Sequence, residues 1–173
     1  FASFVPSSLM LGVTTYITTD LASIPLLWIL PLALYLLTFI LVFSKRNLIP
    51  HSLSIRIIPF ILIPMVPTFF FGTKFGLLII PLHLLMFFFV ALGCHGKLAS
   101  SRPPAENLTE FYLFVSIGGA IGGLFNSLIY PIIFNEILEY PLTVFLACLV
   151  IANFRKDNLL HNIRFYISDI LLP

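Results

Sequence analysis

Charged residues are scarce in this sequence. Only 9% of its 173 residues are Asp, Glu, Lys or Arg, whereas 60% are hydrophobic. Water-soluble domains carry about 25% charged residues, so this chain has too few to cover a surface that faces water. The formal net charge of +2 gives no electrostatic basis for binding nucleic acid. The composition therefore excludes an ordinary soluble domain and predicts a membrane protein that contacts the lipid bilayer.

Cysteines and catalytic motifs are also few. The two cysteines, Cys94 and Cys148, lie in or beside apolar runs without a pairing pattern, so we expect free thiols. Cys94 and the adjacent His95 do not share a helical face, and no second Cys/His pair lies nearby in sequence, so we predict no metal site. Because no Ser-His-Asp, H-E-x-x-H or P-loop pattern occurs, we expect no cofactor and no self-contained enzyme.

What the sequence does contain is a series of long apolar runs. A helix needs about 20 apolar residues to cross the hydrocarbon core of a bilayer. We predict an all-α, polytopic transmembrane bundle of about five complete spans, a single domain at 1–173 that we expect to be a fragment of a larger protein. The expected elements are a short or truncated helix at 6–19, spans at 24–43, 55–72, 77–95, 111–133 and 141–154, and an amphipathic tail at 158–173 that is interfacial or begins another span.

Three local patterns predict where these spans bend, end or begin. The 55–72 span contains prolines at 59, 64 and 67, and this density predicts a broken or strongly kinked element. The glycines at 93 and 96 predict that the 77–95 span ends in a turn, followed by a polar loop at 96–110. Asn107 to Glu110 is typical of a helix start, so the next span should begin there.

The distribution of basic residues predicts the orientation of the chain. If the spans alternate, one side of the membrane receives Lys45, Arg46, Arg56, Lys97, Arg102, Arg155, Lys156 and Arg164. The opposite side keeps only Lys74. Because Lys and Arg are in excess in cytoplasmic loops, we predict an inner-membrane protein whose loops at 44–54, 96–110 and 155–164 face the cytoplasm.

The glycines of the 111–133 span predict close packing of helices. Two interleaved G-x-x-x-G pairs, which let a second backbone approach closely, are formed by Gly118, Gly119, Gly122 and Gly123. At about 100° per residue, one face of this helix carries Gly119, Gly122, Gly123, Asn126 and Tyr130. Because an amide and a phenol should meet protein instead of lipid, we expect packing against the third or the first span, with self-association as the alternative.

Two histidines and an amide within the spans are candidates for contact with a solute or a proton, since such residues often mark transport paths. His83 and Asn126 lie inside predicted spans, where each either forms a structural hydrogen bond between helices or contacts a solute. His95 lies at the same predicted membrane boundary as Glu110. A helix end finished by glycine is the default interpretation; the sharper hypothesis is a His–carboxylate pair that titrates near neutral pH and gates or carries a proton.

Asp20 is the fifth candidate, at the opposite predicted boundary. It follows a run of hydroxyl residues, Thr14, Thr15, Thr18 and Thr19. A carboxylate among hydroxyls suits an ammonium group without a metal, so Asp20 is a possible contact for a cation or polyamine. The alternative is a helix cap at the outer aqueous boundary.

Two blocks of the sequence carry a resemblance to a known family. The first, at 5–43, reads VPSSLMLGVTTYITTDLASIPLLWILPLALYLLTFILVF. The second runs from LHLLMFFFVALGCHGKLASSRP through LTEFYLFVSIGGAIGGLFNSLIYP to LEYPL at 138–142. Together they cover about two thirds of the chain and resemble the membrane region of bacterial fused major-facilitator/spermidine-synthase proteins.

The resemblance implies a polytopic membrane region followed by a spermidine-synthase-like domain of Rossmann type. This chain has neither a G-x-G-x-x-G after a strand nor an acidic pair for a polyamine, so aminopropyl transfer does not belong to these residues. We predict the transporter-like membrane region of such a protein, which handles a small solute such as a cationic amine. The alternative is a non-transporting anchor or scaffold for a fused or associated cytoplasmic aminopropyltransferase-like domain.

Overall fold

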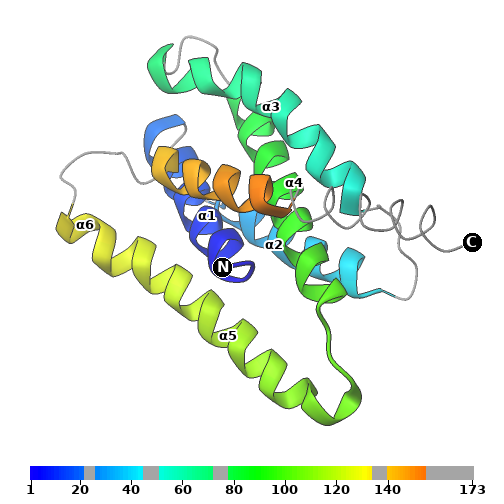
Figure 1. Cartoon of the computed structure of the whole chain (residues 1–173). Helices are drawn as coiled ribbons and strands as arrows, with labels where there is room; N and C mark the ends of the chain where they lie inside the picture. Colours follow the sequence, from blue (N-terminus) through cyan, green and yellow to red (C-terminus); the bar gives the residue numbers. More distant parts are fainter. Residues whose placement is uncertain (22–25, 45–50, 72–77, 134–139, 155–173) are drawn as a thin grey trace, which may run out of the picture.

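The computed structural model describes residues 1–21, 26–44, 51–71, 78–133 and 140–154, and every regular element in these ranges is a helix (Figure 1). Three stretches are long and apolar enough to cross a membrane: Ser52–Phe71, Ile79–Ser100 and Ala105–Ile133. The structure thus confirms an all-α chain with helices that have the length and composition of membrane spans.

Two further apolar helices are shorter, so the described residues show fewer complete spans than the predicted five. They are α2 (Ile29–Phe43) and the Tyr140–Phe154 helix. At 1.5 Å per residue, the 15 residues of α2 extend about 22 Å, less than the ~30 Å of a hydrocarbon core. α2 begins later than predicted because Leu26, with a φ of 82°, opens a turn that ends at Trp28.

α1 (Phe4–Thr15) occupies the middle of the bundle and continues as a π-helical segment, η1 (Tyr16–Leu21). It packs against α2, α4 (Ile79–Ser100) and α5 (Leu108–Leu124). Figure 1 shows α5 along one side of α1 and α4 on the other. Its buried apolar side chains, which belong to the main hydrophobic core, are Val5, Leu9, Val13, Tyr16 and Ile17.

α3 (His51–Phe71) is one continuous helix, and the predicted break at its prolines does not occur. Proline removes a backbone donor, but in a membrane helix neighbouring groups can satisfy the freed carbonyls. Ile58 and Met65 are fully buried in the core that α3 shares with α4. This packing along the length of α3 holds its two halves together in one helix.

α4 runs to Ser100, so the predicted turn at residues 93–97 is wrong. A Cβ added to Gly93 would lie 3.2 Å from Cδ1 of Ile151, and the glycine therefore admits a neighbouring helix instead of ending its own. The hydroxyls of Ser100 and Ser101 donate hydrogen bonds to the Lys97 carbonyl at 2.8 and 2.9 Å and close the helix there.

The predicted polar loop at 96–110 is correspondingly short. Between α4 and α5 lie only residues 101–104 and a 3-10 turn, η3 (Ala105–Asn107). α5 begins at Leu108, directly after Asn107, as the sequence predicted. The same helical stretch continues through a π-helical segment, η4 (Phe125–Ile129), into α6 (Tyr130–Ile133).

The glycine surface of α5 packs against α1 of the same chain. A Cβ added to Gly122 would overlap the carbonyl oxygen of Phe4 and lie 3.1 Å from its carbonyl carbon and Cα. A Cβ on Gly118 would lie 3.3 Å from the Ser3 side chain, and the Ser3 hydroxyl donates a hydrogen bond to the Val115 carbonyl. α1 therefore crosses α5 at backbone contact distance.

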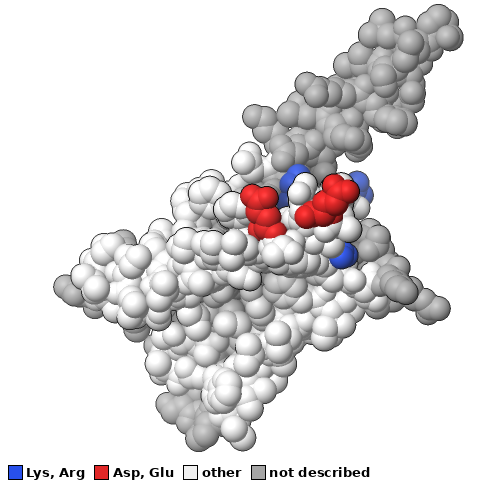
Figure 2. Space-filling model, turned by 90° about the horizontal axis from the view of Figure 1, so that it is seen from below, with Lys and Arg blue, Asp and Glu red and all other residues white. Residues whose placement is uncertain are grey.

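The charged side chains that the structure describes lie together at one end of it. On the face in Figure 2, the blue and red groups lie in one region and the remaining described surface carries no charge. The described basic residues are Arg56 near the start of α3, Lys97 in the last turn of α4 and Arg102 just beyond it. Ile55 lies 3.9 Å from the Cβ position of Gly93, which places the start of α3 beside the end of α4.

Candidate functional site

His83 is fully buried and joins three helices. Its Nε2 lies 2.9 Å from Oγ1 of Thr68 in α3, and its Nδ1 lies 2.8 Å from the hydroxyl of Tyr140. Tyr140 is the first residue of the Tyr140–Phe154 helix. One imidazole in the second turn of α4 therefore ties together two helices that lie far apart in the sequence.

The neighbouring groups determine which nitrogen of His83 carries the proton. The Thr68 hydroxyl donates its hydrogen to the Met65 carbonyl at 2.6 Å, so its oxygen accepts from Nε2–H of His83. In a neutral imidazole the other nitrogen is an acceptor, and Nδ1 therefore accepts from the Tyr140 hydroxyl. The hydrogen bonds thus run in one direction from Tyr140 to Met65, and the Tyr140 oxygen keeps its lone pairs.

Aromatic rings enclose this histidine. The ring centroids of Tyr16 and Phe69 lie 4.8 and 5.6 Å from that of His83. Tyr16 also stacks on Tyr140, with centroids 5.1 Å apart and an interplanar angle of 29°. We call Tyr16, Thr68, Phe69, His83 and Tyr140 the His83 cluster.

Asn126 is buried in η4 and contacts the backbone of α1. Its Nδ2 donates a hydrogen bond of 2.9 Å to the Ser8 carbonyl. Because that carbonyl can only accept, the amide nitrogen must face it, and Oδ1 points elsewhere. Oδ1 of Asn126 and Oγ of Ser8 are both buried without a hydrogen-bond partner.

Gly12 connects Asn126 to the His83 cluster. A Cβ at Gly12 would lie 3.1 Å from Oγ1 of Thr143, 3.4 Å from Cδ2 of Tyr140 and 3.5 Å from Nδ2 of Asn126. The structure therefore brings His83 and Asn126, two of the predicted site residues, into one polar region. This region also contains a residue from each π-helical segment, Tyr16 in η1 and Asn126 in η4, and such segments are frequent at functional sites.

His95 lies elsewhere on α4, roughly 18 Å from His83 along the axis at 1.5 Å per residue. Its Nδ1 is 2.9 Å from Oγ1 of Thr38, whose hydrogen is donated to the Tyr35 carbonyl at 2.7 Å. Nδ1 therefore carries the proton, and Nε2 is an acceptor that is buried without a hydrogen-bond partner. The ring of Phe39 lies 3.7 Å from the imidazole, centroid to centroid.

The predicted pair between His95 and Glu110 is not formed. His95 is fully buried, whereas Glu110 is exposed in the first turn of α5. The physical reason is the continuation of α4 beyond Gly93, which leaves His95 inside a helix packed on α2.

The hydroxyl groups that precede Asp20 in the sequence are largely engaged within their own helix. Thr14, Thr18 and Thr19 donate to carbonyls of their own helix at 2.6, 2.8 and 2.6 Å. The backbone of Asp20 belongs to η1, and its side chain lies outside the described structure. The predicted cation contact at this residue therefore stays a prediction.

The sequence did not predict which hydroxyl groups bond the buried histidines. Thr38, Thr68 and Tyr140 each bond a histidine, yet in the sequence each is one polar residue within or beside an apolar run. A buried imidazole needs a hydrogen-bond partner, so each isolated hydroxyl in another span was a candidate for that partner. Which hydroxyl meets which histidine depends on helix packing.

Metal ligands are not clustered in the described part of the chain, where no group of three or more His, Cys, Asp or Glu side chains could hold an ion. The polar region is thus a set of hydrogen-bonding groups enclosed by helices. Comparison with protein-family models, curated proteins and solved structures gave no match for this chain.

Proposed function

We propose that this chain is a transporter-like membrane domain whose polar interior contacts a small cationic amine. The polar interior is the region formed by Asn126 and the His83 cluster. The observation that carries the proposal is the chemistry of the unused hydrogen-bonding positions. Oδ1 of Asn126 is a buried acceptor without a partner, and the Tyr140 oxygen keeps lone pairs. A solute rich in N–H donors complements these atoms, whereas an anionic solute would find no donor in them.

The surroundings of these acceptors also suit a cation. The rings of Tyr16 and Phe69 lie beside His83, and aromatic faces attract ammonium groups. The described Lys and Arg residues are Arg56, Lys97 and Arg102. They lie near the start of α3 and the end of α4, whereas the His83 cluster lies near the end of α3 and the start of α4. No cationic side chain of the described residues therefore competes with an amine at the His83 cluster.

We further propose that α2 and the Tyr140–Phe154 helix also cross the membrane, which gives five crossings. The distribution of basic residues supports this topology, with loops 44–54, 96–110 and 155–164 in the cytoplasm. The position of the described charges at one end agrees with that side being aqueous (Figure 2). Fusions of alkaline phosphatase and green fluorescent protein after residues 49, 74, 103 and 137 test the topology. Fluorescence only after 49 and 103 supports it; fluorescence after 74 contradicts it.

The family resemblance supports the choice of amine. If this chain is the membrane region of a fused major-facilitator/spermidine-synthase protein, putrescine and spermidine are the solutes to try first. The test is uptake of labelled putrescine into proteoliposomes that contain the purified protein. Uptake above empty vesicles supports the proposal, and it should fall strongly in Asn126→Leu but not in Ser127→Ala. Ser127 is the matched control because its exposed hydroxyl bonds only its own helix, at the Gly123 carbonyl.

The second candidate is a membrane anchor or scaffold. It is favoured by one observation, namely that protein groups satisfy both ring nitrogens of His83, as in a purely structural contact. An anchor predicts a folded protein that takes up no putrescine or spermidine. That outcome, with the helical content of the reconstituted protein intact, would replace the transport proposal.

A further inference from the structure

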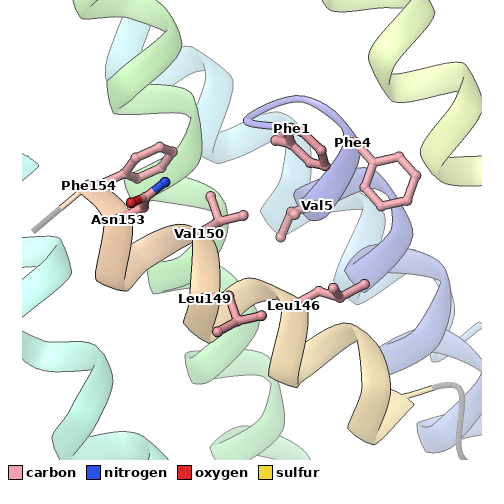
Figure 3. A pocket seen from close by; sticks show the side chains of 8 residues that line it. All are labelled: Phe1, Phe4, Val5, Leu146, Leu149, Val150, Asn153 and Phe154. Atoms are coloured by element: carbon pink, nitrogen blue, oxygen red, sulfur yellow. The ribbon is translucent and has the colours of Figure 1, made fainter. Parts of the chain in front are cut away.

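An apolar groove lies between the start of α1 and the Tyr140–Phe154 helix. Its volume is about 410 Å³, within the range of about 300–1,000 Å³ typical of ligand pockets. Figure 3 shows side chains from the two helices on opposite sides of this space. The lining residues are Phe1, Phe4, Val5, Leu146, Leu149, Val150, Asn153 and Phe154.

The groove is polar at one end only. Asn153 carries the single polar side chain of the lining, and it lies beside Phe154 at the last turn of its helix (Figure 3). Nζ of Lys97 stands over the Phe154 ring, 5.7 Å from its centroid. The apolar groove therefore leads to the amide of Asn153 and the ammonium group of Lys97. Both lie near the end of α4, which Arg102 follows.

We propose that this groove holds one acyl chain of an anionic phospholipid, whose phosphate lies at Lys97 and Asn153. A groove with this lining offers water almost no hydrogen-bonding partners, so in a bilayer it is filled by hydrocarbon. A phosphate at the Lys97 end meets a cation, which attracts anionic lipids at the cytoplasmic surface of a membrane. The proposal does not depend on which solute the polar interior takes.

The length of the groove suits one acyl chain. From Leu146 to Phe154 the helix rises about 12 Å at 1.5 Å per residue, which is close to the ~15 Å of one hydrocarbon leaflet.

The test is native mass spectrometry of the full chain, released from nanodiscs that contain equal amounts of phosphatidylglycerol and phosphatidylcholine. We expect one retained phosphatidylglycerol per chain. Leu149→Trp fills the groove and should remove this lipid, whereas Leu128→Trp, at a similarly exposed leucine of η4, should retain it. Leu149→Phe is the milder variant if the tryptophan reduces helical content in circular dichroism.

The headgroup contact has its own variant. Lys97→Gln should lower the preference for phosphatidylglycerol over phosphatidylcholine about fivefold, the effect of one basic residue near an anionic surface. Arg56→Gln, which removes an exposed charge of a residue that does not line the groove, should leave the preference unchanged. Equal retention of both lipids by the wild-type chain would overturn the proposal. So would equal lipid retention by the two tryptophan variants, or a dimer in the spectra that Leu149→Trp abolishes.

Discussion

The close contact between α1 and α5 makes a sharp prediction, because two adjacent glycines differ in what a methyl group would meet. In Gly122→Ala the new Cβ overlaps the Phe4 carbonyl oxygen and lies 3.1 Å from two further backbone atoms. In Gly123→Ala the nearest atom outside the helix is Cδ1 of Leu11 at 3.9 Å, an ordinary contact. A backbone obstacle cannot rotate away, so α1 and α5 must separate in the first variant only.

The magnitude follows from a comparison of the two variants. Replacing glycine by alanine in a helix favours folding by up to about 1 kcal/mol, and this gain is common to both positions. Overpacking a close contact destabilises by about 1–3 kcal/mol, and this loss applies only at Gly122. We therefore expect Gly122→Ala to be about 1–3 kcal/mol less stable than Gly123→Ala.

The assay is reversible unfolding of the purified protein in mixed micelles, followed by circular dichroism. Each variant is compared with the wild type at the same detergent composition, so that the difference reports on the contact. Equal free energies of unfolding for the two alanine variants would refute the close approach of α1 to Gly122. A change in oligomeric state without a change in stability would favour self-association through the glycines.

Two further predictions concern buried side chains. Thr68→Val leaves Nε2–H of His83 without its acceptor and should destabilise the protein by about 1–3 kcal/mol. In the same unfolding assay, the control variant Thr18→Val should change stability by less than about 0.5 kcal/mol, because that hydroxyl bonds only its own helix. A loss at Thr18 equal to that at Thr68 would contradict the assigned hydrogen bonds. Cys94 is fully buried and Cys148 is partly exposed. N-ethylmaleimide should therefore modify Cys148 first, as read by mass spectrometry. Faster labelling of Cys94 would argue against the packing of α4.

The helical class and most element positions could be predicted because they depend on local composition. Apolar runs of the right length predicted the three long helices, and Asn107 marked the start of α5. The spacing of the glycines predicted a close helix contact, and Gly122 makes that contact with α1. These features need no knowledge of which helices are neighbours.

The remaining features depend on tertiary contacts. Gly93 looks like a helix end in the sequence, but it lies inside α4 because Ile151 of another helix packs against it. The prolines of α3 predicted a break that packing against α4 prevents. The same reasoning explains the site, since His95 was assigned to Glu110 by membrane depth, whereas its partner is Thr38 of a packed helix.

The most direct test of the central proposal is equilibrium binding of labelled putrescine to the purified protein in nanodiscs. We expect saturable binding that unlabelled putrescine displaces and neutral 1,4-butanediol does not. Asn126→Leu removes a buried acceptor and should weaken binding about tenfold or more, the effect of losing one hydrogen bond to a charged group. Ser127→Ala should bind as the wild type does. No saturable binding, or equal affinities for the two variants, would contradict an amine site in the polar interior.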